Sequence, residues 1–191
     1  MRGQLKRLSR DLRATTVYVT HDQVEALTMS DQIVVMRAGK IEQQGTPYEI
    51  YHDPATRFVA EFIGDPRINV MKGTLRRDGT SVAVEFDGTT FRIPCVQAVG
   101  SGPVDIAIRP EAVQILDAPA DGAIPARVEL LQPTGAQTIA TLATATAHVT
   151  ALIPSFVQSL GADQVWISFD STRMLLFDPR TGLRIALSGN G

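Results

Sequence analysis

The residue of this sequence best suited to chemistry is His21, which stands in the tripeptide Thr20-His21-Asp22. The preceding residues, 15–20, are apolar and β-branched, which predicts a strand buried on both faces in a parallel sheet. Side chains that follow such strands lie at the edge of the sheet where α/β folds bind ligands. One histidine without a partner specifies little, so the pattern alone also fits a surface histidine in front of a capped helix.

The remaining reactive residue types do not form a second site. His52 and His148 are far from His21 along the chain and lack the spacing of metal ligands, so we predict no metal site. The serines in strand-like surroundings lack the glycine pair of a nucleophile elbow, which argues against a Ser-His-Asp set. The single cysteine, Cys95, cannot form an internal disulfide, and we expect a buried structural thiol.

The sequence contains no phosphate-binding loop. Such a loop needs G-x-x-x-x-G-K-[ST], whereas the only Gly-Lys pair, Gly39-Lys40, is followed by Ile41 and has Val34 in place of the first glycine. The sequence before His21 also lacks an apolar run that ends in Asp-Glu, the pattern that would supply an aspartate to hold Mg²⁺ and a catalytic glutamate. The final residues, "LSGNG", are similar to the LSGGQ signature of some ATPases. That signature belongs at the start of a helix, ahead of an apolar run that ends in Asp-Glu, so we interpret this match at the end of the sequence as coincidence.

The elements expected around His21 alternate between helices and strands. Residues 1–12 predict an amphipathic helix, and Asp22 with Glu25 predicts a capping box at the start of the next helix. Two apolar runs joined through Ala38-Gly39 predict a hairpin. Two short helices should follow, the first capped by Thr46-Pro47 with Glu49 and the second introduced by Asp53-Pro54, and residues 64–66 should end this region.

From residue 67 onward the pattern predicts a β-rich unit. Apolar residues alternate at Val82/Val84/Phe86, Ile106/Ile108 and Val165/Ile167/Phe169, between turns rich in Gly, Asp and Pro. The spacing fits a small barrel or sandwich, with an OB-like barrel preferred. The Ala/Thr-rich run 140–153 predicts two strands around a turn.

Composition limits the partners that the chain can have. Among 191 residues, 18 Lys+Arg face 20 Asp+Glu, and the β-rich part has no basic stripe and few aromatics, so a nucleic-acid partner is not predicted. No run approaches the roughly 20 apolar residues of a membrane span, and the charged start lacks the apolar core of a signal peptide. We therefore expect a cytoplasmic chain.

Several stretches together resemble a known family. "VYVTHDQVEALTMSDQIVVMRAGKIEQQGTPYEIYHDPATRFVAEFIGDP" resembles the C-terminal end of the nucleotide-binding domain of ABC transporter ATPases of the maltose and glycerol-phosphate importer type. "DIAIRPEAVQI", "ARVELLQPTGAQT" and "FDPRTGLRI" resemble pieces of the TOBE regulatory domain of that subfamily. The resemblance implies an α+β chain in which residues 1–66 are an α/β remnant of the nucleotide-binding domain and residues 67–191 a mostly β, OB-like TOBE domain.

The same resemblance implies a role for His21 and a cellular setting. In this family Thr20-His21-Asp22 would be the switch loop, whose histidine hydrogen-bonds the γ-phosphate and helps orient the attacking water. The intact subunit would use ATP and Mg²⁺, dimerise through its regulatory domain, and sit on the inner face of the plasma membrane under permease subunits. It would couple ATP hydrolysis to uptake of a carbohydrate or glycerol-phosphate-like solute. The alternative is a free-standing OB-like sensor domain that binds a small anion or sugar.

For the 191-residue chain by itself, the sequence predicts how it should behave toward ATP and whether it should self-associate. Without the Walker A, signature and Walker B motifs it should neither bind Mg-ATP measurably nor hydrolyse it, because those groups supply the positioning and charge stabilisation of phosphoryl transfer. A strand and helix deprived of their sheet should expose apolar surface and self-associate. The sequence leaves open the solute, the regulatory partner, and whether Met1 is a natural start or a truncation.

Overall fold

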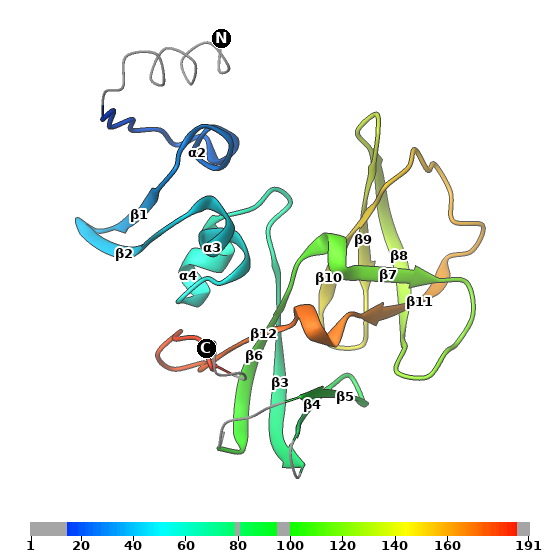
Figure 1. Cartoon of the computed structure of the whole chain (residues 1–191). Helices are drawn as coiled ribbons and strands as arrows, with labels where there is room; N and C mark the ends of the chain where they lie inside the picture. The colour runs from blue at the N-terminus through cyan, green and yellow to red at the C-terminus, as the bar shows by residue number, and fades with distance from the viewer. Residues whose placement is uncertain (1–14, 79–80, 95–99, 187–191) are drawn as a thin grey trace. The chain divides into compact units, whose positions relative to one another are not determined.

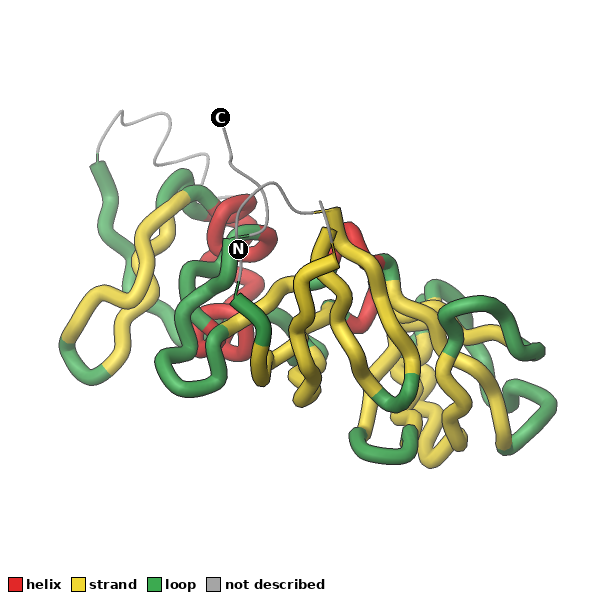
Figure 2. The backbone as a smooth tube through the Cα atoms, turned by 90° about the horizontal axis from the view of Figure 1, so that it is seen from below, coloured by secondary structure: helices red, strands yellow, loops and turns green. Residues whose placement is uncertain are grey.

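The computed structural model describes residues 15–78, 81–94 and 100–186 (Figure 1). The chain separates into two compact units, residues 1–64 and 65–191. The first combines short helices with one hairpin, and strands dominate the second (Figure 2). The predicted helix at residues 1–12 and the environment predicted for Cys95 lie outside the described residues.

The strand predicted at residues 15–20 does not form. This segment has no regular secondary structure and belongs to no sheet, and Val17 and Val19 are 87% and 91% exposed, so the prediction of a strand buried on both faces is wrong for this chain. Strands gain their stability from cross-strand pairing and packing, and none of the described strands pairs with this segment. The β-branched, apolar composition of residues 15–20 therefore favours a strand, but the described residues include no partner strand to form it.

A short hairpin forms the centre of the first unit. Strands β1 (Ile33–Arg37) and β2 (Lys40–Gly45) pair antiparallel, as the sequence predicted. Both turn residues have positive φ, 48° at Ala38 and 78° at Gly39, which is the requirement of a type I′ turn. One face of β1 packs into a small core made of Ile33, Val35, Ile50, Val59 and Ile63.

Two helices complete this core. Helix α3 (Pro47–His52) begins with the predicted capping box between Thr46 and Glu49, which is confirmed. Helix α4 (Arg57–Phe62) differs from the expectation, because its N-cap is Thr56 and not the Asp53-Pro54 pair. The Thr56 hydroxyl accepts the Val59 N–H at 3.2 Å, so the helix begins at the residue whose side chain reaches an N–H of its first turn.

The capping box of α3 predicts a pH dependence. The Thr46 backbone N–H, 2.7 Å from Glu49 Oε2, and then the Thr46 hydroxyl hold the pKa of Glu49 below its usual value. A depressed carboxyl pKa contributes stability above the unfolded-state pKa and loses it as pH falls through the folded-state pKa. We therefore expect the first turn of α3 to loosen in the acid range below pH 4.5, the ordinary Glu value.

Carboxyl-carbon NMR titration of Glu49 checks this expectation. Thr46→Val is the matched variant, because it removes the hydroxyl and keeps the backbone N–H that makes the larger contribution. The pKa of Glu49 should rise only part of the way in that variant. A pKa at or above 4.5 in the unaltered chain would show that the capping contact is not formed in solution.

The described residues of the second unit form two five-stranded antiparallel sheets. One sheet has the order β12-β6-β3-β4-β5 and the other β10-β9-β8-β11-β7, so the chain leaves the first sheet after β6 and returns to it at β12 (Figure 1). The mostly β character predicted from residue 67 onward is confirmed. The strands are β3 (Asn69–Asp78), β4 (Ser81–Phe86), β5 (Thr89–Pro94), β6 (Gly102–Ile108), β7 (Val113–Leu116), β8 (Ile124–Pro133), β9 (Thr138–Ala143), β10 (His148–Ile153), β11 (Gln164–Phe169) and β12 (Leu175–Phe177).

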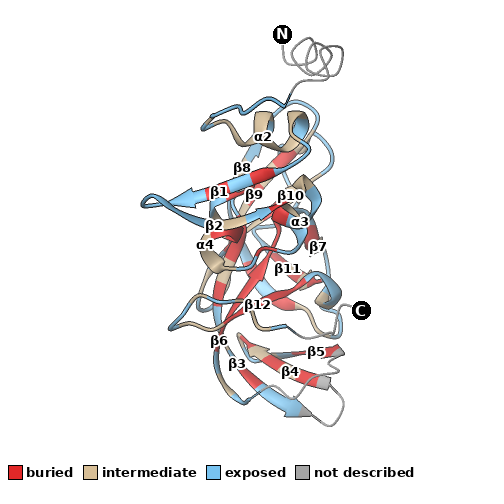
Figure 3. Cartoon of the chain, turned by 60° about the vertical axis from the view of Figure 1, so that its left-hand side comes forward, coloured by how far each residue is buried: buried red, intermediate tan, exposed pale blue. Residues whose placement is uncertain are grey.

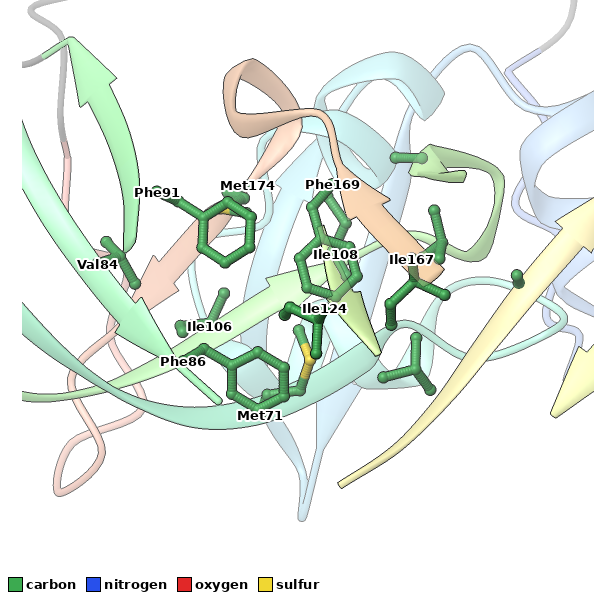
Figure 4. Close-up of a cluster of buried hydrophobic side chains, with 14 of the residues drawn as sticks. Met71, Val84, Phe86, Phe91, Ile106, Ile108, Ile124, Ile167, Phe169 and Met174 are labelled. Atoms are coloured by element: carbon green, nitrogen blue, oxygen red, sulfur yellow. The ribbon is translucent and has the colours of Figure 1, made fainter. Parts of the chain in front are cut away.

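The alternating apolar residues fill one core between the two sheets. The alternating positions picked out in β4, β6 and β11 are all buried, as predicted, and the Ala/Thr-rich run forms the paired strands β9 and β10 (Figure 3). Three aromatic rings from both sheets meet in this core. The Phe169 ring lies 5.4 Å from that of Phe91 and 6.2 Å from that of Phe86 (Figure 4).

A single amide joins the edge of one sheet to the other. Asn69 of β3 is 7% exposed, and its side chain donates to the carbonyls of Ile108 at 3.2 Å and Thr150 at 2.8 Å. Its Oδ1 accepts the Thr150 N–H at 2.7 Å. Since Thr150 lies on the edge strand β10, the Asn69 side chain substitutes for the missing backbone ladder between the sheets. The two sheets thus enclose one core as a barrel does, without a continuous backbone ladder among the described strands.

The last described turn is fixed by a carboxylate. Asp178 Oδ1 accepts the backbone N–H groups of Thr181 at 2.9 Å and Arg180 at 2.8 Å, and these bonds lower the pKa of Asp178. Gly182, with φ of 70°, donates its N–H to the Asp178 carbonyl and turns the chain back. Arg184 then bridges to Phe177 of β12, so this turn extends the edge of the first sheet.

Candidate functional site

His21 lies at a bend immediately before helix α2 (Gln23–Met29). The residue is exposed, and no hydrogen bond or ion pair with another described residue engages its imidazole. The ring is therefore available to a group outside the described part of the first unit. An available imidazole N–H can hydrogen-bond an anionic oxygen.

The backbone on both sides of His21 is held in place. Thr20 Oγ1 accepts the Asp22 N–H at 2.9 Å, so the two neighbours of His21 are bonded to each other across it. Asp22 Oδ1 then accepts the N–H groups of Val24 at 2.8 Å and Glu25 at 3.1 Å as the N-cap of α2. The N-cap predicted at Asp22 is confirmed, and it fixes the point at which the loop enters the helix.

Glu25 makes different contacts from those that a capping box requires. Its Oε2 accepts the Thr20 hydroxyl at 2.9 Å and the Tyr18 hydroxyl at 3.1 Å, while the Asp22 N–H goes to Thr20 Oγ1. Glu25 therefore does not accept the backbone N–H of Asp22, as a capping box requires, and contacts the segment before the loop instead. The reason is local, because the Thr20 hydroxyl accepts the Asp22 N–H and at the same time donates to the Glu25 carboxylate.

Neither the role of Tyr18 nor the contact of Glu25 with the segment before the loop was predicted from the sequence. Tyr18 and Thr20 are two residues apart, and their side chains meet one acceptor on α2. That spacing was readable from the sequence. What the sequence did not show was that the helix would place Glu25 within reach of both hydroxyls.

The other two histidines each contact a neighbour within their own unit. His52 packs against the ring of Tyr48, with centroids 4.5 Å apart, and His148 Nε2 lies 3.2 Å from Glu129 Oε2 in the second unit. Among residues 15–78, 81–94 and 100–186, no group of His, Cys, Asp and Glu is arranged to hold a metal ion. The site therefore consists of His21 and the loop that carries it.

A groove of about 970 Å³ in the second unit lies between β3, the β4–β5 turn and the β9–β10 turn. Four ionisable side chains line it, and each already has a hydrogen-bonding or charged partner. Lys72 Nζ is 2.6 Å from buried Asp105, and Glu85 pairs with Arg76 at 3.2 Å. Asp87 bonds Thr146, and His148 contacts Glu129. The four ionisable side chains of the groove thus differ from His21, whose imidazole has no hydrogen bond or ion pair with a described residue.

Comparison with known proteins identifies the class of the second unit. Residues 106–177, which run from within β6 to the end of β12, match the family model of the TOBE domain. The β-rich unit thus contains a segment that is similar to the TOBE domain. No helix among the described residues has the length and apolarity needed to cross a membrane.

Nearly the whole chain is similar to ATP-binding proteins of ABC transporters. The uncharacterized ABC transporter ATP-binding protein y4oS of Sinorhizobium fredii is 39% identical over 97% of this chain and 49% of that protein. The sn-glycerol-3-phosphate import ATP-binding protein UgpC 1 of Rhizobium johnstonii is 33% identical over 95% of this chain and 49% of its own length. UgpC of Escherichia coli is 32% identical over 97% of this chain and 52% of its own length.

The chain is thus related to the TOBE-bearing part of ABC importer ATP-binding proteins, the family that the sequence motifs indicated. It spans about half the length of the curated relatives it matches. Among solved structures, the molybdate-binding protein ModG with molybdate bound is similar at a TM-score of 0.41 and 14% identity, over 56% of this chain and 94% of that one.

Proposed function

We propose that this chain supplies the C-terminal end of the nucleotide-binding domain, residues 1–66, and the OB-like TOBE regulatory domain, residues 67–191, of an ABC importer ATPase. The observation that carries the proposal is the similarity of 95–97% of the chain to sn-glycerol-3-phosphate import ATP-binding proteins. The complete subunit would hydrolyse Mg-ATP to drive uptake of a glycerol-phosphate-like or carbohydrate solute. It would do so as a dimer bound to permease subunits at the cytoplasmic face of the membrane.

In this proposal His21 is the switch histidine. The exposed imidazole, on a loop tied down at both ends, would hydrogen-bond the γ-phosphate and orient the attacking water. The groups that bind ATP and Mg²⁺ would come from the remainder of such a subunit, because this sequence contains no G-x-x-x-x-G-K-[ST] loop. The exposure of Val17 and Val19 supports this view, since both residues would be covered by neighbouring strands of the complete domain.

A chimeric subunit tests the proposal. Residues 1–191 replace the matching segment of Escherichia coli UgpC, and glycerol-3-phosphate uptake is measured in cells lacking UgpC together with the ATPase rate of the purified chimera. We expect uptake above the empty-vector level. His21→Ala should lower kcat for ATP hydrolysis by about 100-fold or more, the range found when proton transfer or water positioning is lost.

His52→Ala is the matched control, since it removes an exposed imidazole of the same unit that stacks on Tyr48. Its kcat should stay within about twofold of the chimera, as expected for a surface substitution away from the site. Circular dichroism establishes that each variant is folded. A folded chimera whose hydrolysis is unaffected by His21→Ala would refute the switch role.

A further inference from the structure

The hydrogen bonds around the loop converge on one carboxylate. Glu25 Oε2 accepts from the hydroxyls of Tyr18 at 3.1 Å and Thr20 at 2.9 Å, and the Thr20 hydroxyl oxygen in turn accepts the Asp22 N–H at 2.9 Å. A single side chain on the first turn of α2 therefore anchors both the segment that enters the loop and, through Thr20, the residue after His21. We propose that Glu25 is the positioning residue for His21, an assignment that rests on the proposed function for its catalytic consequence.

The charge of Glu25 suits it to this task. Hydrogen bonds to an ionised acceptor are roughly twice as strong as those between neutral groups. Thr20 and Glu25 are half-buried, which shields their contact from competing water. Two hydroxyls separated by two residues therefore bind one oxygen and fix the direction in which the chain approaches His21.

The contacts also explain why Glu25 acts through the loop and not on the ligand. Its Oε2 already accepts two hydroxyls, and no described contact joins it to the imidazole. His21 is the residue between two anchored neighbours, so the freedom left to it is mainly the rotation of its own side chain. Fixing a reacting group in this way matters because a displacement of about 1 Å can cost as much as 10²-fold in rate.

The first test uses the 191-residue chain alone and needs no activity. Backbone ¹⁵N relaxation should show His21 in Glu25→Ala with an order parameter well below the value of about 0.85 for a rigid backbone. Glu25→Gln should keep the order parameter of His21 well above that in Glu25→Ala, because the amide oxygen still accepts both hydroxyls, although in weaker bonds than the carboxylate. Thr20→Val removes the link to Asp22 by another route and should loosen His21 as well.

Glu61→Ala is the matched control, since Glu61 is a partly exposed glutamate of the same unit paired with Arg57 at 3.7 Å. It should leave His21 unchanged. Helical chemical shifts of α2 must persist in Glu25→Ala, which separates loop loosening from loss of the helix. If His21 stays ordered in both Glu25→Ala and Thr20→Val, the positioning role is overturned.

The second test measures ATP hydrolysis in the UgpC chimera. Glu25→Ala should lower kcat about 10-fold while the KM for ATP stays within about twofold, because the loop would orient groups in the transition state and not bind the nucleotide. Glu25→Gln should restore kcat. An unchanged kcat in Glu25→Ala, where His21→Ala is inactive, would overturn the positioning role and leave the proposed function intact. A His21→Ala chimera that remains active would instead refute the proposed function, and the relaxation experiment alone would then decide whether Glu25 holds the loop.

Discussion

Replacing Phe169 by alanine is expected to lower the free energy of unfolding of the second unit by about 3–5 kcal/mol. Phe169 is 8% exposed and is the aromatic residue of β11 that meets Phe86 and Phe91 from the other sheet. Its removal deletes a buried ring, leaves a cavity between two sheets, and breaks two aromatic contacts at once. Neither sheet can close the cavity alone, because each is held in register by its own ladder.

Urea unfolding followed by the fluorescence of Trp166 measures this effect. Trp166 is the only tryptophan and lies three residues before Phe169 on β11, so it reports on the second unit. Phe156→Ala is the control, because it makes the same deletion at a side chain that is 58% exposed. That control should stay within about 0.5 kcal/mol of the unaltered chain. A Phe169→Ala loss below about 1 kcal/mol would mean that the two sheets do not share the aromatic contact.

Replacing Asn69 by alanine is expected to cost about 3 kcal/mol, close to the effect of losing a large core side chain. The change deletes three hydrogen bonds, to the carbonyls of Ile108 and Thr150 and from the N–H of Thr150. It leaves their backbone groups without these partners in a largely buried place, where each unsatisfied group costs about 1–3 kcal/mol. Since these bonds join β3 to the edge strand β10, the edge of the second sheet should also open more often.

Amide hydrogen exchange at Thr150 is the direct readout, because its N–H is the donor to Asn69 Oδ1. In Asn69→Ala this amide should exchange much faster, while amides of β4 should change only as far as overall stability does. Thr150→Val serves as the control, since Asn69 binds the backbone of Thr150 and not its hydroxyl. That variant should keep both the protection and the stability. Unaltered Thr150 protection in Asn69→Ala would contradict the joining role of the amide.

Features governed by neighbours along the chain were predictable. The turn at Ala38-Gly39 and the capping box at Thr46 depend on a few consecutive residues, and both formed as expected. Alternation along β4, β6 and β11 was equally informative, because a strand with one face in a core must place every second residue there. The family was likewise predictable, since its motifs are local stretches of sequence.

Errors arose where an element depends on something distant. Residues 15–20 have the composition of a buried strand, yet the described residues provide no neighbouring strand to cover Val17 and Val19. The start of α4 moved from Asp53-Pro54 to Thr56, because several residues in that stretch could cap and only the packed chain selects one. The composition of a segment favours one kind of secondary structure, but whether that structure forms depends on how the segment is buried in the folded chain.

By itself, the sequence determined the mostly β class of the second unit, the turn at Ala38-Gly39, the caps at Asp22 and Thr46, and the family to which the chain is related, and it offered His21 as the candidate for chemistry. Only the tertiary structure decided what surrounds these features. It brought Tyr18 and Thr20 to Glu25, and it placed the Asn69 amide between two sheets, 81 residues from Thr150. The physical reason is that turns and caps draw on interactions within a few residues. The contacts of Glu25 depend on the bend between Thr20 and α2, and those of Asn69 depend on how two complete sheets pack, which no local pattern encodes.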